Sequence, residues 1–304
     1  TKTSSMRKAL ACLVEVDIRN NKGVFKEKST IDWDRPHGTS VEFLIDGRIQ
    51  LNGEAGILNY LTGTALVNPH LTLHYQLPEM ELQTVERVST LIPEIPEPTE
   101  PHPHTMKLGE FIAHSHLFGR TKVGAWLKKG FSRVHEGTLK DLIKAGIKAS
   151  VIERMVDSLN EVEFKALFVA LQGLQLMAPS TKSVLTIGEE AMAKSIQRLG
   201  SVDFYSVVSR KPTICDFKPV QIDVAIARLL DKNIEAESQV QVLRFANRVP
   251  LQFDKSSCAI VHALESVNWR AYGLVQPKGS IPQGPYIIAV SVVSPFIKFK
   301  NASK

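Results

Sequence analysis

The chain has 304 residues, of which 43% are hydrophobic and 22% are charged, and it carries a formal net charge of +6 at pH 7. This length and composition are enough for about two globular domains and exclude a disordered chain. Neither a run of about 18 apolar residues nor a signal peptide occurs, so the sequence favours neither membrane insertion nor secretion. Three widely spaced cysteines, Cys12, Cys215 and Cys258, favour neither a disulfide framework nor a zinc site. We therefore expect a reducing, intracellular compartment.

The first part of the chain predicts strands. Apolar residues alternate between Cys12 and Ile18 and again from Val41 to Ile45, and a polar turn, Asn20 to Gly23, follows the first run. Residues 54–66 predict a helix and residues 70–75 another strand. Because the chain opens directly into strand residues, we expect part of this first domain to lie upstream of Thr1 and to pair with them.

A proline-rich stretch predicts the clearest domain boundary. Residues 93–103 contain five prolines, which disfavours helix and sheet and favours an extended spacer. From 106 to about 177 the pattern is helical, with short helices broken at glycines. Phe164, Leu167, Phe168, Leu171 and Leu174 form an apolar stripe at helical spacing, which predicts a buried core rather than a cofactor site.

The positive charge is concentrated in residues 102–150, which contain nine Lys or Arg but three Asp or Glu, together with five His. This excess predicts a surface that contacts phosphates, because cations that neutralise a nucleic-acid backbone release its counterions. The candidate DNA-binding residues are Lys122, Lys128, Lys129 and Arg133. The alternative is a solvated, charged pair of helices.

The region after Pro179 has a different pattern. Apolar residues alternate over 220–226 and 288–292, residues 243–251 are apolar and basic, and residues 260–267 predict a helix face. Two strands, a helix and a further strand predict a mixed α/β layer domain.

Several enzyme motifs are absent or incomplete. Gly119 to Gly124 has phosphate-loop spacing, but Ala125 and Trp126 replace the required Lys and Ser or Thr. No Gly-x-Ser-x-Gly elbow supports a serine hydrolase. The histidine pairs at 102/104 and 114/116 lack the acidic or cysteine ligands of a metal site, so we interpret them as a helix start and as phosphate contacts.

Two further segments have alternative interpretations. In residues 33–42 (WDRPHGTSVE), Gly38 and Thr39 could bring backbone and a hydroxyl close to an adenine-type ligand, or simply form a turn into a strand. In residues 244–251 (RFANRVPL), Arg244 and Arg248 flank a stretch that also fits an edge strand with structural ion pairs.

Taken in order, short segments along nearly the whole chain resemble the B subunit of type IIB DNA topoisomerases (topoisomerase VI), a member of the GHKL ATPase family. The segments are WDRPHGTSVE at 33–42, NPH at 68–70, HPH at 102–104, FSRV at 131–134, MAPST at 177–181, IGE at 187–189, RKP at 210–212 and RFANRVPL at 244–251.

The resemblance implies an α+β multidomain protein. Residues 1–92 would be the C-terminal part of a GHKL (Bergerat) α/β sandwich and 93–101 a linker. Residues 102–178 would be a helix-two-turn-helix domain, and 179–304 an α/β transducer domain. The chain would be a fragment that lacks the N-terminal ATP-site motifs and the C-terminal transducer helix.

The ATP site that the resemblance implies is largely missing from this sequence. The family's catalytic Glu, its Mg²⁺-holding Asn, its adenine-reading Asp in D-x-G-x-G and its Gly-rich lid have no counterpart here, so no catalytic residue and no metal ligand are expected in the chain. Thr39 would lie near the adenine-reading Asp. Phe296 occupies the position of the transducer lysine that contacts the γ-phosphate, so Lys298 or Lys300 would have to replace it.

The resemblance therefore implies a B subunit that binds ATP and Mg²⁺, dimerises through its missing N-terminal region and captures duplex DNA. Its complex would contain two A and two B subunits, in the cytoplasm of an archaeon or the nucleus of a eukaryote, without a membrane. This chain alone would not hydrolyse ATP. The alternative is a B-like scaffold, inactive as an ATPase, that holds a DNA-cleaving partner as in meiotic break formation; a third, weaker one is a stand-alone nucleic-acid-binding helical module.

Overall fold

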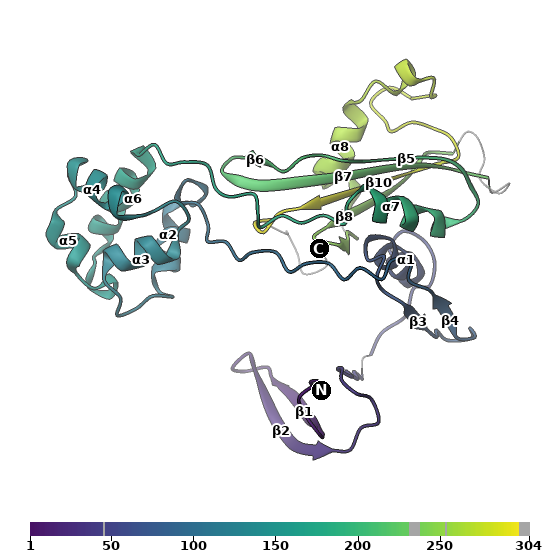
Figure 1. Ribbon diagram of the computed structural model, residues 1–304, viewed down its shortest axis with the longest axis horizontal. Coiled ribbons are helices and arrows are strands. Elements are labelled where there is room, and N and C mark those ends of the chain that lie inside the picture. Colours follow the sequence, from purple (N-terminus) through teal and green to yellow (C-terminus); the bar gives the residue numbers. More distant parts are fainter. Residues whose placement is uncertain (45, 231–237, 253, 298–304) are drawn as a thin grey trace. The chain divides into compact units, whose positions relative to one another are not determined.

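The computed structural model describes residues 1–44, 46–230, 238–252 and 254–297 (Figure 1). The chain divides into two compact units, Thr1–Ile49 and Gln50–Lys304, which are considered separately. No helix among the described residues is long and apolar enough to span a membrane.

The first unit is built on an antiparallel hairpin of β1 (Ala9–Asp17) and β2 (Lys22–Ile31). The first predicted strand and its polar turn are thus confirmed. The strand predicted over 41–45 is wrong for residues 41–44, which form no regular structure; Ile45 lies outside the described residues. Apolar side chains of the hairpin are exposed on both strands, including Val16 (69%) and Phe25 (67%). A two-stranded hairpin is marginally stable by itself.

The second unit contains a mixed sheet in the order β5-β7-β10-β8-β9 (Figure 1). The strands are β5 (Val202–Ser209), β6 (Thr213–Cys215), β7 (Lys218–Leu229), β8 (Gln241–Ala246), β9 (Val249–Pro250) and β10 (Tyr286–Val293). β6 pairs with one end of β7, β10 runs parallel to β8, and the other pairs are antiparallel.

Successive residues of the central strands point to opposite faces of this sheet, and apolar residues point to both faces. Helices therefore cover both faces. Ala225 and Ala227 of β7 face the core formed with α1 (Ile57–Val67) and α7 (Glu189–Ile196). Val224 and Ile226 face the core formed with α8 (Ala259–Ser266) and the 3-10 helix η5 (Trp269–Tyr272). Figure 1 shows α8 on one side of the sheet and α7 on the other. The predicted mixed α/β layer is confirmed.

Three elements of this layer have weak sequence signals and were missed. β5 lies at a sheet edge and is largely exposed, β6 has three residues, and α7 buries only Met192, Ser195 and Ile196. Short 3-10 turns, η3 (Gln197–Leu199) and η4 (Lys255–Ser257), extend two of the helices.

Residues 50–101 contain few regular elements besides α1. The predicted helix is confirmed but begins at Ile57 rather than 54, and the predicted strand at 70–75 is the shorter β3 (Leu73–Tyr75), paired with β4 (Gln83–Val85). Residues 93–101 have no regular structure, as the proline content predicted.

Residues 103–173, called here the helical part, form a separate apolar core. Its elements are η1 (Pro103–Thr105), α2 (Leu108–Ser115), α3 (Val123–Gly130), α4 (Glu136–Lys144), α5 (Ala149–Glu153), η2 (Val156–Ser158) and α6 (Glu161–Gly173). Phe164, Leu167 and Leu171 of the predicted stripe lie in this core with Trp126. Gly124 is also buried here, inside α3 rather than in a phosphate-binding loop.

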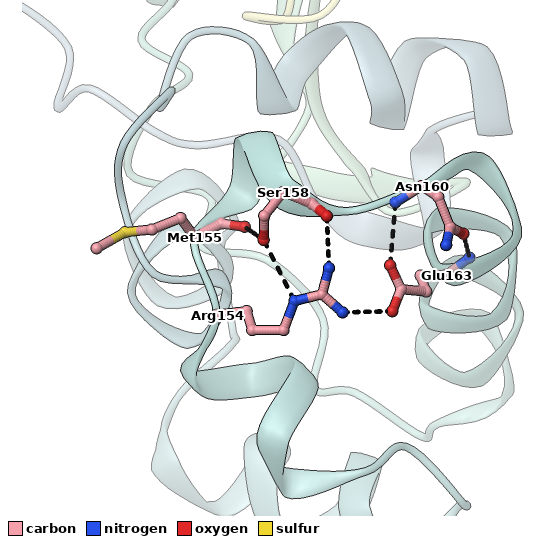
Figure 2. Close-up of polar contacts among 5 residues, drawn as sticks. All are labelled: Arg154, Met155, Ser158, Asn160 and Glu163. Atoms are coloured by element: carbon pink, nitrogen blue, oxygen red, sulfur yellow. Dashed lines mark hydrogen bonds and ion pairs between the residues drawn. The ribbon is translucent and has the colours of Figure 1, made fainter.

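A polar network fixes the start of α6 (Figure 2). The Asn160 side chain accepts from the Glu163 N–H at 2.9 Å, and Glu163 accepts from the Asn160 N–H at 3.0 Å, which is a reciprocal cap. Arg154 donates to Glu163 at 2.5 Å and to the Ser158 hydroxyl at 3.2 Å. These contacts, the Asn160 N–H first and Arg154 second, lower the pKa of Glu163.

Candidate functional site

The loop after the last strand is clamped to the turn between β8 and β9. The Ser294 N–H donates to Asn247 Oδ1 at 3.0 Å, and Asn247 Nδ2 donates to the Ser294 carbonyl at 3.0 Å. The Asn247 N–H also donates to the carbonyl of Val292 at 2.9 Å. Ser294 is buried, and its hydroxyl accepts from the Phe296 N–H at 3.3 Å. Asn247 therefore holds the last-strand loop as a paired strand would.

The neighbouring Arg248 connects the same turn to two other segments. Its guanidinium donates to the carbonyls of Leu185 (3.4 Å) and Thr186 (3.2 Å), just before α7. Its own carbonyl accepts from Asn68 Nδ2 at 3.3 Å, and Asn68 Nδ2 also donates to the carbonyl of Thr64 in α1 at 2.8 Å. The Asn247–Arg248 turn thus joins α1, the approach to α7 and the end of β10.

A buried carboxyl group stands near this turn. Asp223 of β7 is fully buried, and its Oδ1 accepts from the Ser209 hydroxyl at 2.5 Å. Burial raises the pKa of Asp223, while the Ser209 hydrogen bond and the charge of Arg248 oppose that rise. Burial lowers the pKa of Arg248, and Asp223 opposes that shift. The two groups therefore stabilise each other's charged form inside the fold.

A cavity of about 300 Å³ lies beside the clamp. Its lining residues come from the spacer, the approach to α7, the turn and the end of β10: Glu94, Pro96, Ser183, Leu185, Asn247, Arg248, Val293, Ser294 and Pro295. The Ser183 hydroxyl is buried without a hydrogen-bond partner among the described residues. The RFANRVPL segment thus includes an edge strand, β9, as its structural interpretation held, and the guanidinium of Arg248 donates to backbone carbonyls.

The predicted nucleotide contacts are Thr39, Lys298 and Lys300. Phe296 follows the clamped loop, whereas Lys298 and Lys300 lie outside the described residues. Thr39 belongs to the unit Thr1–Ile49, where its exposed hydroxyl accepts from the Thr1 hydroxyl at 3.2 Å. The described residues contain no group of three or more metal-binding side chains.

The four predicted DNA contacts lie on one segment of the helical part but differ in their partners. Lys122 pairs with Glu153 at 2.8 Å, and Lys128 pairs with Glu136. Arg133, at φ 64°, donates to the carbonyl of Ala178 at 2.8 Å. Lys129 is exposed and has no ion-pair partner within the described part of the chain. Exposed ion pairs are weak, so the paired lysines stay available to a phosphate.

The histidine prediction is confirmed in one part, because His102 caps the start of the 3-10 helix η1, but its phosphate contacts need correction. His102 is fully buried, and both of its ring nitrogens are occupied by protein groups. His104 and His114 are also bound inside the fold, to the carbonyl of Leu171 and to Trp126 Nε1. His102 is buried, and His104 and His114 are half-buried. All three rings pack against aromatic rings and hydrogen-bond to protein groups, so we assign them packing roles instead of phosphate contacts.

The sheet with its clamped last-strand loop matches a known class. Residues 179–304, which include the sheet, match the family described as the topoisomerase VI B subunit, transducer. The chain as a whole is similar to the B subunit of type 2 DNA topoisomerase 6 from three archaea, which confirms the resemblance seen in the sequence.

The similarity covers nearly all of this chain but only part of each relative. The identity to the Methanococcoides burtonii protein is 33% over 90% of this chain and 43% of the relative. For Methanosarcina barkeri the values are 30%, 100% and 48%, and for Pyrococcus horikoshii 25%, 99% and 60%. The chain thus spans about half the length of the curated relatives it matches.

Proposed function

We propose that this chain is part of the ATP-binding B subunit of a type IIB DNA topoisomerase. In the complete complex, with two A and two B subunits, ATP would close a dimer gate that captures duplex DNA, and the A subunit would cleave the other duplex. The observation that carries the proposal is the similarity to these archaeal B subunits over 90–100% of the chain, together with the transducer match. A protein that acts on DNA in this way would work inside the cell.

We further propose the domain assignment that the resemblance implies. Residues 1–92 would be the C-terminal part of the GHKL domain, 93–101 the linker, 102–178 the helix-two-turn-helix domain and 179–304 the transducer. The separate apolar core of the helical part and the unstructured spacer before it support two of these boundaries.

ATP and Mg²⁺ belong to the proposal for the whole protein. Thr39, Lys298 and Lys300 remain candidate ATP contacts, but the residues that would polarise water and hold Mg²⁺ are expected outside these 304 residues. No hydrolytic step is assigned to the described side chains. The chain by itself is therefore expected to be inactive as an ATPase.

In this proposal, the hydrogen bonds between Asn247 and Ser294 allow the transducer to transmit movement of the last-strand loop. A loop that carried a phosphate-sensing lysine would transmit a force only if its base were fixed to the rest of the domain. Asn247 supplies that fixation, and Arg248 extends it to α1 and to the approach to α7. A displacement of the loop would therefore also move α1 and the approach to α7.

Reconstitution tests the proposal. The full-length protein that contains this chain, mixed with its A subunit, should relax supercoiled plasmid in the presence of ATP and Mg²⁺ and not with ADP. Formation of a complex with the cleaving partner without any ATP turnover would instead identify the scaffold, an alternative that the names of the relatives do not favour. Failure to associate with an A subunit would contradict both.

A further inference from the structure

The turn of the β6–β7 hairpin has an unusual backbone. Asp216 and Phe217 both have positive φ values, 47° and 57°. This is the left-handed pair of a tight hairpin turn, in which Asn, Asp and Gly are common but a bulky aromatic residue is not. A strained position of this kind persists only where the surrounding structure compensates for it. The contacts of the Phe217 ring therefore require an explanation.

The ring of Phe217 lies between two histidines of the helical part's entry segment. It stacks on His102, with ring centroids 4.6 Å apart and planes 11° apart. It meets the edge of His104 at 4.8 Å and 87°. Both are favourable aromatic geometries. Phe217 belongs to none of the three hydrophobic clusters of the described residues, so these histidines are its main aromatic neighbours.

The two histidines form a socket for Phe217, and hydrogen bonds to backbone groups orient both rings. His102 Nδ1 accepts from the His104 N–H at 3.3 Å, and its Nε2 must donate to the carbonyl of Met177 at 3.2 Å. One neutral tautomer is thereby fixed. His104 Nε2 donates to the carbonyl of Leu171 at 3.2 Å. Each imidazole is thus oriented by backbone groups of the helical part and its exit.

The socket lies at the base of the helical part, where the chain enters and leaves it. His102 stands where the chain enters the helical part, and Met177 stands where the chain leaves it, so one hydrogen bond closes the base of this part. Arg133 reinforces the exit by its bond to Ala178. Phe217, far from His102 in sequence, arrives from the sheet. The β6–β7 hairpin turn thus contacts the helical part at its base.

We propose that the ring contacts of Phe217 with the His102–His104 socket form a joint, a contact that fixes the orientation of the helical part relative to the six-stranded sheet. The Phe217 ring is half-buried and is held by ring contacts rather than by a hydrophobic core. It can therefore leave the socket while the helical part and the sheet both stay folded. The joint also decides in which direction the helical part presents its exposed cations.

Distance measurements between two spin labels test this joint. One label replaces Lys140, exposed on α4, and the other replaces Val208, which is 48% exposed on β5, in the 304-residue chain. The exposed cysteines, Cys12 and Cys215, are changed to serine, and the buried Cys258 is kept. We expect one narrow distance distribution, which Phe217→Ala broadens and Phe217→Tyr preserves.

A matched control uses Phe204→Ala, which removes an aromatic ring that is 49% exposed on β5 of the same sheet but outside the joint. We expect its distribution to stay narrow. Hydrogen exchange of α6 and β7 in Phe217→Ala should match that of the unsubstituted chain, which shows that both bodies remain folded. A narrow, unshifted distribution in Phe217→Ala, equal broadening in Phe204→Ala, or loss of protection in α6 and β7 would each overturn the joint.

Discussion

Asn247 and Ser294 form a reciprocal pair of hydrogen bonds, each at 3.0 Å, although 47 residues separate them in the sequence. The pair attaches the loop after the last strand to the β8–β9 turn. Because Ser294 is buried, its N–H and carbonyl depend on a protein partner, and Asn247 supplies both hydrogen bonds. The Asn247–Ser294 pair thus stabilises the fold and also fixes the base of the loop.

Asn247→Ala should lower the free energy of unfolding by about 1–3 kcal/mol, because it leaves buried backbone groups of Ser294 unpaired. Urea denaturation would measure this loss, and the amide of Ser294 should lose its protection from hydrogen exchange. Asn247→Gly is the backbone control, since φ is 49° at this position and glycine accepts it without strain. If Asn247→Gly kept Ser294 protected, the side-chain clamp would be refuted.

The buried His102 predicts a loss of stability in mild acid. Burial first, and then the charges of His104 and Arg133, lower its pKa from 6.5 to about 4. Between those values the unfolded chain binds a proton that the folded chain does not, so stability is fully present above pH 6.5 and falls as the pH falls toward 4. The slope approaches about 1.4 kcal/mol per pH unit from this group.

His102→Gln provides the comparison for that effect, because glutamine can donate and accept but does not titrate. Its free energy of unfolding should be lower near neutral pH and should change less on acidification toward pH 4 than that of the unsubstituted chain. The difference between the two profiles isolates His102 from the carboxylates, which titrate in both proteins. Parallel profiles would show that His102 titrates normally.

Lys129→Glu should weaken binding to duplex DNA of any sequence and reduce the slope of log affinity against log salt by about 1–2, since one cation is removed and one anion is added. Fluorescence anisotropy at several salt concentrations would measure it. Lys128→Glu together with Lys129→Glu should weaken binding further. Lys165→Glu, the same charge change at an exposed position of α6, is the control. An equal effect there would mean that net charge, not this surface, decides binding.

Gly130→Ala should destabilise the helical part. An added Cβ would lie 2.6 Å from His114 Cε1 and 3.0 Å from Phe118 Cζ, so the packed rings must shift at a cost of about 1–3 kcal/mol. Gly109→Ala, in α2 with no atom within 4 Å of the new Cβ, should instead stabilise by about 0.5–1 kcal/mol. Thermal unfolding of both variants would show opposite shifts; shifts of the same sign would contradict this packing.

The sequence by itself determined the features that depend on neighbouring residues. Alternation over 220–226 and 288–292 predicted the central strands, the stripe at 164–171 predicted the core of α6, and the prolines of 93–101 predicted the spacer. Weakly patterned elements escaped: α7 buries too few residues for a clear helical period, and β5 gains its strand only by pairing with β7.

Tertiary structure alone decided which distant groups meet. In the sequence the histidines near 102 are polar residues beside cations, which suggests contact with phosphate; in the fold His102 is buried because Met177 and Phe217 reach it from distant parts of the chain. The same holds for Asn247 at Ser294. A hydrogen bond or a ring contact between distant residues follows from strand order and loop path, which local periodicity does not encode, and burial then fixes the protonation state and the role of the side chain.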